Sequence, residues 1–519
     1  MVKYVLRMQP GNRVILNTAI LYAKMVVSIL VGLISTRLVL KALGVEDYGI
    51  YNLVAGVVSM LAFLNTSLAA STQRFLSFSL GKQDVRHLKK IFYYSLILHI
   101  GIGVCVILLI ETVGIYGIKH VLTIAPDKIS NTLSILHLLS CSVFFSIVAV
   151  PYIAVLISRE NMLLLSLIEI AETVLKLLGA VYLLTYPGNR LIMYSAIIVA
   201  VMIISLLLKM IICRMKYPET RIVFQSLNDR TLLRELTSFA GWYTFASVGS
   251  MGRGQGIPMI LNVFFGVVVN AAYGIANQVN GLMQFFATAI LQSIRPQIIK
   301  SEGAQDRIRV KKLSLVACRY MFFLCALFSI PLIIEMPYVL HLWLGNPPEY
   351  TVGFCRLVLL STLLFMITCG LGTAIDATGN IKWMYIWMGS LHFLNLPVGY
   401  FLLKAGMSAY SVLWVVVGEE LICMWVRIYL ANRIVGISVR KFVRRVIVPI
   451  TIVTGATVLA GIVAIFYMHT GFLRLVVTSM LCTCTFLITG WFCGIENEEK
   501  SRFKNIMHNI TAQFKLVKR

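Results

Sequence analysis

YGIYNLVAG, the stretch from Tyr48 to Gly56, returns later in the chain as YGIANQVNG, from Tyr273 to Gly281, with six of the nine positions identical. A second echo follows each copy. GKQDVRHLKK begins at Gly81 and GAQDRIRVKK begins at Gly303, and the two share a glycine, a glutamine, an aspartate and both final lysines at an offset of 222. Two matches in the same order and at nearly equal spacing predict that the chain contains two copies of one structural unit.

The composition is that of a membrane protein. Of the 519 residues, 59% are hydrophobic and only 13% are charged, whereas soluble domains carry about 25% charged residues. Apolar runs of about 20 residues, each long enough to cross a bilayer as a helix, recur from Val14 to Cys493. About fourteen transmembrane helices are expected, centred near residues 25, 59, 102, 145, 174, 202, 249, 281, 324, 363, 393, 420, 457 and 482.

The charge distribution is a topology signal. The net charge of +25 would suit a nucleic-acid partner if it were gathered on a soluble surface. The connections between spans alternate between the two sides of the membrane, and most of the 46 lysines and arginines fall on the side that holds both termini. Because basic loops stay in the cytoplasm, we expect cytoplasmic N- and C-termini and no nucleic-acid partner.

The repeat divides the chain into four segments. We expect an N-terminal six-helix lobe at residues 1–213, a cytoplasmic linker at 214–236, a C-terminal six-helix lobe at 237–430, and two extra helices with a cytoplasmic tail at 431–519. An even number of helices per copy gives both copies the same orientation, as in transporters built from parallel repeats. The predicted fold class is an all-α polytopic membrane protein with two pseudo-symmetric lobes around a central cavity.

Polar residues within the spans are expected to face that cavity or another helix. Tyr48 and Asn52 lie on one face of the second span, and the matching Tyr273 and Asn277 lie on one face of the eighth. The first span has a polar stripe of its own around Lys24. The candidate substrate-binding residues are Lys24, Arg253, Asn17, Ser28, Asn52, Asn277, Gln284, Tyr48 and Tyr273.

Two cations are central to this hypothesis. Lys24 lies deep in the first span, where reaching the cytoplasm would be strained, so it either pairs with a glutamate of another helix or attracts an anionic substrate. Arg253 lies within GSMGRGQG, from Gly249 to Gly256. No strand precedes this segment, which excludes a nucleotide-binding loop. Its glycines indicate close helix packing or local unwinding beside a cavity, with Arg253 as the second cavity cation.

Acidic residues within the spans are candidates for ion coupling or internal pairing. Glu169, Glu172 and Lys176 share a face of the fifth span, and Glu172 and Lys176 have the i,i+4 spacing of an ion pair. Glu419 and Glu420 are adjacent in the twelfth span. A titrating carboxylate would couple transport to protons or sodium, whereas a buried ion pair would only hold helices together. Both alternatives stay open for these residues.

No enzyme motif is present. The sequence contains no G-x-x-x-x-G-K-[ST] phosphate-binding loop, and its 11 cysteines form no C-x-x-C pair. We therefore expect no catalytic residue, no cofactor and no metal site, and we do not expect an enzyme.

Several segments resemble one family. STRLVLKALGVEDYGIYNLVAGVVSM (Ser35 to Met60), NTAILYAK (Asn17 to Lys24), the GKQD loop and DATGNIKWM (Asp376 to Met384) are similar to Wzx-type flippases of O-antigen and capsule repeat units. These flippases form the polysaccharide transporter branch of the multidrug/oligosaccharidyl-lipid/polysaccharide (MOP) exporter superfamily. The resemblance implies a MATE-like fold whose cationic cavity residues attract pyrophosphate, and Lys24 and Arg253 fit that role by position and type.

The resemblance also implies a function. Such a protein moves undecaprenyl-pyrophosphate-linked oligosaccharide from the inner to the outer leaflet of the bacterial inner membrane by alternating access, for lipopolysaccharide and other surface polysaccharide biosynthesis. Its implied partners are the lipid-linked substrate, membrane lipids, H⁺ or Na⁺ as coupling ion, and the polysaccharide polymerase or export machinery. Relatives that act on the peptidoglycan precursor carry an arginine-rich first-helix motif, and the single Lys24 stands there instead.

Two alternative functions come from other classes. A MATE-like drug or cation antiporter would share the fold, although many such exporters carry an acidic residue in the first helix, and this chain has none there. A membrane-embedded polymerase or ligase for the same glycan would need a large periplasmic loop, and the loops expected here are short.

Overall fold

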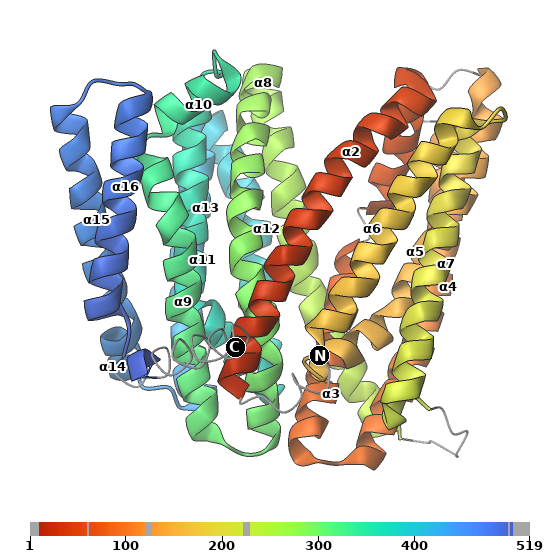
Figure 1. Ribbon diagram of the computed structural model, residues 1–519, viewed down its shortest axis with the longest axis horizontal. Coiled ribbons are helices and arrows are strands. Elements are labelled where there is room, and N and C mark those ends of the chain that lie inside the picture. Colours follow the sequence, from red (N-terminus) through yellow and green to blue (C-terminus); the bar gives the residue numbers. More distant parts are fainter. Residues whose placement is uncertain (1–9, 60–61, 121–125, 222–228, 497–498, 502–519) are drawn as a thin grey trace, which may run out of the picture. The chain divides into compact units, whose positions relative to one another are not determined.

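The structure is a computed structural model that describes residues 10–59, 62–120, 126–221, 229–496 and 499–501. All regular secondary structure within these ranges is helical (Figure 1). Ten of the described segments are long and apolar enough to cross a membrane. The prediction of an all-α polytopic membrane protein is confirmed.

Every predicted span centre lies within a described helix. The segments that are long and apolar enough to cross a membrane are nevertheless fewer than the predicted transmembrane helices. α6 (Met162–Thr185) and α13 (Tyr410–Leu430) each carry three charged side chains, which lowers their apolar character. Inside α2 (Pro10–Ser59) and α8 (Arg230–Gly303), two successive helices are joined without a loop. The division at residues 213, 236 and 430 stays a prediction.

Two compact units make up the chain, and unit 1 comprises Arg13–Ser247 together with Ile299–Gln305. Its helices are α2, α3 (Ala62–Lys82), α4 (Val85–His120), α5 (Ile129–Ser158), α6, α7 (Arg190–Lys216) and both ends of α8, with short 3-10 turns η1 (Pro126–Lys128) and η2 (Pro218–Thr220). α5 packs against α3, α4 and α7 (Figure 1). Aliphatic side chains such as Ile135 and Leu136 form its core.

Unit 2 comprises Val248–Ile298 and Asp306–Arg519. Its helices are the middle of α8, α9 (Arg307–Ile334), α10 (Met336–Leu344), α11 (Thr351–Thr378), α12 (Lys382–Lys404), α13, α14 (Val439–Phe442), α15 (Val448–Tyr467) and α16 (Phe472–Thr489), with π-helical turns η3 (Ala431–Val435), η4 (Val443–Ile447) and η5 (Gly490–Gly494). α11 packs against α9 and α13, and the neighbouring α15 and α16 both contact α9 (Figure 1).

Matched glycines turn the chain in both halves. Gly44 within α2 and Gly266 within α8 have φ values of 78° and 76°, in the left-handed region that glycine enters without steric cost. Each joins one helix directly to the next. The two glycines are separated by 222 residues, the offset that relates GKQD to GAQD.

The G-x-Q-D copies make equivalent turns between helices. Gln83 and Gln305 have φ values of 59° and 61°. Asp84 and Asp306 each accept a hydrogen bond from the backbone N–H three residues further on, at 2.9 and 3.0 Å, and so cap α4 and α9. The repeated motif is therefore a combined turn and helix-cap signal.

The matched glycines Gly81 and Gly303 meet within unit 1. A Cβ added to Gly81 would overlap the carbonyl oxygen of Lys300, and a Cβ added to Gly303 would overlap that of Phe78. The backbones of α3 and α8 approach this closely only because both positions lack a side chain.

The spacing of these matched glycines also changes the alignment of Tyr48–Gly56 with Tyr273–Gly281. They are equally spaced in the two halves, so the offset of 222 holds at both ends of the helices between them. By that offset Tyr51, rather than Tyr48, corresponds to Tyr273. Both rings contact another aromatic ring, with centroids 4.8 Å apart for Tyr51 and Tyr194 and 6.4 Å apart for Tyr273 and Phe354.

Candidate functional site

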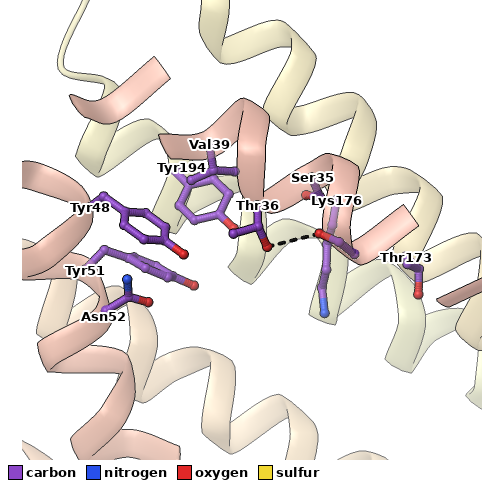
Figure 2. Close-up of a pocket in the computed structure, with 10 residues that line it drawn as sticks. Ser35, Thr36, Val39, Tyr48, Tyr51, Asn52, Thr173, Lys176 and Tyr194 are labelled. Carbon is purple, nitrogen blue, oxygen red and sulfur yellow. Dashed lines mark hydrogen bonds between the residues drawn. The ribbon is translucent and has the colours of Figure 1, made fainter. Parts of the chain in front are cut away.

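A cavity of about 280 Å³ lies in unit 1 among α2, α6 and α7 (Figure 2). The rings of Tyr48, Tyr51 and Tyr194 lie together on one side of it (Figure 2). The other lining residues are Gly32, Ser35, Thr36, Val39, Asn52, Thr173 and Lys176. Aromatic rings, hydroxyl groups, one amide and one ammonium group suit a polar ligand that carries negative charge.

Because of the turn at Gly44, two successive parts of α2 line the same cavity. Ser35 and Thr36 precede the turn, whereas Tyr48 and Asn52 follow it, and all four line the cavity. The glycine thus places both arms of α2 on one ligand-sized space. Tyr48 and Asn52, two of the predicted cavity residues, lie here.

Lys176 extends from the cavity into a network of charged groups on α6 and α7. Its Nζ lies 2.8 Å from Oε1 of Glu172, the predicted i,i+4 pair. Oε2 of Glu172 accepts a hydrogen bond from the Ser205 hydroxyl at 2.9 Å. The Nζ of Lys209, which is only 5% exposed, lies 2.9 Å from that hydroxyl and 3.9 Å from Oε2 of Glu172. Glu172 therefore compensates the charge of a buried ammonium group.

Lys24 forms an ion pair with Glu169 of α6, with 2.5 Å between Nζ and Oε2. The structure thus has the pairing that was one of the two alternatives for this lysine. Together with Glu172, Lys176 and Lys209, the pair gives three ammonium groups and two carboxylates in unit 1. The excess of one positive charge favours an anionic ligand.

Three predicted cavity residues of unit 1 lie outside the cavity lining, namely Lys24, Asn17 and Ser28. Asn17 is buried, and its amide donates a hydrogen bond to the backbone carbonyl of Glu160 at 3.2 Å, at the turn between α5 and α6. Ser28 is half-buried and does not line the cavity.

Unit 2 holds an acidic cluster among α8, α12 and α13. Nη1 of Arg253 lies 3.2 Å from both oxygens of Glu419 and from Oε1 of Glu420. Glu419 is also hydrogen-bonded to Nδ1 of His392, and it accepts a hydrogen bond from the Asn395 amide at 2.7 Å. With a neutral imidazole, the cluster has an excess of one negative charge, opposite in sign to the network of unit 1.

One carboxylate oxygen of the cluster lacks a donor. Oε2 of Glu420 is buried, with no hydrogen-bond partner among the described residues, and so is Oδ1 of Asn395. An unpaired buried carboxylate oxygen is costly. In the described ranges, no group of three or more His, Cys, Asp or Glu is placed to hold a metal ion.

The glycines around Arg253 allow close packing of two helices. The segment from Gly249 to Gly256 is continuous helix. A Cβ on Gly249 would lie 2.8 Å from the carbonyl oxygen of Gly389, and one on Gly256 would lie 2.6 Å from the Leu396 side chain. α8 therefore approaches α12 closely enough to bring the guanidinium group to the cluster. Of the two predicted roles, close packing is the one observed.

Two of the predicted polar residues of the second copy come together, because the side chain of Tyr273 is hydrogen-bonded to that of Asn277. Tyr273 is 6% exposed in the hydrophobic core of unit 2, where its ring packs against Phe354. Asn277 and Gln284 are exposed and lie outside the acidic cluster. An aromatic ring gains more from a packed apolar core than from a cavity, so Tyr273 is a core residue.

Lys209, His392 and Asn395 are among the residues of these sites that were absent from the sequence-based prediction. Each is a polar residue within an apolar run, which was the available signal. His392 and Asn395 are three residues apart, the spacing that puts two side chains on one helix face. Their common partner is on another helix, 27 and 24 residues further along the chain.

No family model matches the sequence, and no curated protein matches it. Solved structures match by fold. A crystal structure of MATE in the bent conformation has a TM-score of 0.68 at 14% identity, and the match covers 83% of this chain and 97% of that chain. An outward-facing multidrug resistance MATE family transporter of the MOP superfamily also has a TM-score of 0.68, at 13% identity and with the same coverage. The chain has the MATE fold.

A third structure with the MATE fold is a MOP superfamily transporter from Pyrococcus furiosus, whose binding pocket of reversed polarity suggests a different function for that protein. It has a TM-score of 0.69 at 13% identity, and the match covers 83% of this chain and 97% of that chain. Identities this low establish the fold alone. The ligand must be inferred from the chain's own residues.

Proposed function

We propose that the chain is a membrane transporter that flips undecaprenyl-pyrophosphate-linked oligosaccharide from the inner to the outer leaflet of the bacterial inner membrane. The observation that carries this proposal is the cavity of unit 1, where tyrosine, asparagine, serine and threonine side chains lie beside Lys176. Sugars hydrogen-bond to hydroxyl and amide groups and pack against aromatic rings. A pyrophosphate attracts ammonium groups. The resemblance to Wzx-type flippases agrees with this chemistry.

Lys176 is the residue that we expect to bind the pyrophosphate. Its side chain is 30% exposed and that of Glu172 is 16% exposed, and ion pairs with solvent access contribute about 1 kcal/mol or less. A doubly charged phosphate group can therefore replace the carboxylate at small cost. Glu172 would still have the Ser205 hydroxyl and Lys209, so no carboxylate would be left without a partner.

In this proposal the acidic cluster of unit 2 supplies the coupling. The guanidinium group of Arg253 already occupies the position from which a metal cation would balance the negative charge of the two glutamates. The coupling ion in this proposal is therefore a proton and not sodium. One proton on Glu420 neutralises the cluster, and its loss restores the negative charge. The oligosaccharide would occupy the polar cavity while the polyprenyl chain stays in lipid. Both termini would be cytoplasmic, and the product would pass to the polysaccharide polymerase or export machinery.

The proposal is tested in the source organism. Deletion of the gene should leave lipid-linked repeat units on the cytoplasmic leaflet and remove a surface polysaccharide, and the intact gene should restore both. Mass spectrometry of the accumulated lipid would then identify the sugar. Normal surface polysaccharide in a deletion strain that lacks a redundant flippase would contradict the proposal.

A second candidate is a MATE-like drug or cation antiporter, and the buried carboxylates of unit 2 favour it. Glu419 and Glu420 would attract an organic cation if Arg253 moved away. Expression in a drug-sensitive host separates the two candidates, because an antiporter would raise resistance to cationic drugs and a flippase would not. Arg253→Ala should increase that resistance if the antiporter is correct.

A further inference from the structure

The two densest basic runs of the chain meet in unit 2. RIRVKK (Arg307–Lys312) begins α9, and RKFVRR (Arg440–Arg445) extends from α14 into η4. Each has four basic residues in six positions, more than any other six-residue stretch of the sequence. More than a hundred residues separate them along the chain. Their spatial proximity therefore comes from the fold.

The loop that follows α13 links the two runs. Nη1 of Arg307 lies 3.5 Å from the carbonyl oxygen of Ile434. Nζ of Lys311 lies 3.1 Å from the position that a Cβ would take on Gly436. Gly436 has a φ of 74° and ends the turn η3, and Arg433 of that turn is exposed. Basic groups from α9 and from η3 thus border one surface.

The second run is held in place by its apolar residues. Phe442 is 1% exposed and Val446 is fully buried. The carbonyl oxygen of Arg445 accepts a hydrogen bond from Nη1 of Arg319 at 3.3 Å. Because the backbone is fixed on its inner side, the remaining side chains face outward. Of these side chains, Arg445 lies 3.6 Å from Glu496.

Three of these outward side chains have no partner among the described residues. The side chains of Arg440, Lys441 and Arg444 are exposed and make no hydrogen bond or ion pair with any residue that the structure describes. Other arginines of unit 2 are neutralised by acids, such as Arg319 by Glu499 at 2.5 Å. The unpaired charges therefore remain available to a ligand from outside the chain.

The neighbouring residues indicate that these cations lie at the boundary of the membrane. Val439 and Val443 are 40% and 42% exposed, next to Arg440 and Arg444 along the chain. The same segment continues into α15, within a candidate membrane span from Val439 to Tyr467. Apolar side chains beside arginines at the end of a span suit the boundary between acyl chains and headgroups.

We propose that Arg307, Lys311, Arg433, Arg440, Lys441 and Arg444, here called the basic surface, bind the headgroup phosphates of anionic glycerophospholipids in the surrounding membrane. Guanidinium groups bind phosphate oxygens in a bidentate manner, and each basic residue near an anionic surface contributes about 1 kcal/mol. The acyl chains would lie against Val439 and Val443. The proposal is independent of the transported substrate.

Lipid binding to the full-length protein tests the proposal. The purified protein is delipidated, phosphatidylglycerol or phosphatidylcholine is added, and bound lipid is measured by native mass spectrometry. Wild-type protein should bind phosphatidylglycerol preferentially. The variant with Arg440→Gln, Lys441→Gln and Arg444→Gln should bind it at least about tenfold more weakly. The single variant Arg444→Gln should show an intermediate loss, so the test stands even if the triple variant does not fold.

A matched control removes three exposed basic residues of unit 1, with Arg86→Gln, Lys89→Gln and Arg230→Gln. This variant should bind phosphatidylglycerol within about twofold of wild type. Equal losses in both triple variants, or no preference for phosphatidylglycerol in the wild type, would overturn the proposal. So would displacement of the lipid by millimolar inorganic phosphate, because it would indicate a site for free phosphate.

Discussion

Lys24 and Glu169 form a 2.5 Å ion pair between α2 and α6, although 145 residues separate them in sequence. Lys24→Ala would leave the carboxylate without its cation in a low-dielectric setting, and we expect a loss of stability of about 1–3 kcal/mol. The exchange of Lys24→Glu with Glu169→Lys should restore the unfolding temperature in detergent, and also transport. Restored stability without transport would mean that Lys24 contacts the substrate.

Lys176 should matter for transport more than for stability. Lys176→Gln removes the ammonium group from the cavity but leaves Glu172 with its other partners. We expect a reduction in flipping of at least about tenfold, with an unfolding temperature close to wild type. Lys209→Gln is the contrasting variant, because Lys209 is buried and its loss should lower stability first. Full transport by a folded Lys176→Gln protein would contradict the proposed pyrophosphate site.

The two neighbouring glutamates of α13 should respond differently to substitution. Glu419 binds Arg253, His392 and Asn395, so Glu419→Gln should lower stability by about 3–5 kcal/mol. Glu420 has an oxygen to which no described residue donates a hydrogen bond, so Glu420→Gln should keep the fold and abolish the dependence of transport on a proton gradient. Transport into liposomes with and without an imposed pH gradient measures this dependence. An unchanged response of Glu420→Gln would exclude Glu420 as the proton carrier.

The contact between Gly81 and Gly303 predicts a steric effect. Alanine at either position would overlap a backbone carbonyl group, and overpacking of this kind costs about 1–3 kcal/mol. Both variants should therefore unfold at lower temperature than wild type. Gly241→Ala is the control, because Gly241 is helical and has open space around its Cβ position. That variant should be neutral or slightly stabilising, and an equal loss in all three would contradict the steric explanation.

The helices could be predicted from sequence because apolar runs of span length leave few alternatives to a membrane helix. Several charged residues within those runs were also recognised, although Lys209 was not. Lys176 does pair with Glu172, because i,i+4 spacing is a local property. The partners of Lys24 and Arg253 could not be assigned, since each is on a helix more than a hundred residues away. Such pairings depend on which helices become neighbours.

The sequence comparison also did not give the register in which the two halves correspond. The match of Tyr48 with Tyr273 rests on letter identity, whereas the positive-φ glycines show that Tyr51 is equivalent to Tyr273. A displacement of three residues turns a side chain by about 60° around the helix axis. Tyr51 both lines the cavity and packs against the core of unit 1, whereas Tyr273 lies in the hydrophobic core of unit 2. Backbone conformation is thus the safer guide to equivalence between the halves.

Gly44 and Gly266 make the same turn in both halves, yet the charged network of unit 1 has an excess of positive charge and the acidic cluster of unit 2 an excess of negative charge. In an ancestor assembled from two identical half-length chains, every mutation would have appeared twice. Two copies within one chain are free of that restriction, because each half can change alone. In the proposed function, the anion-binding residues of unit 1 can therefore change without any change in the acidic residues of unit 2.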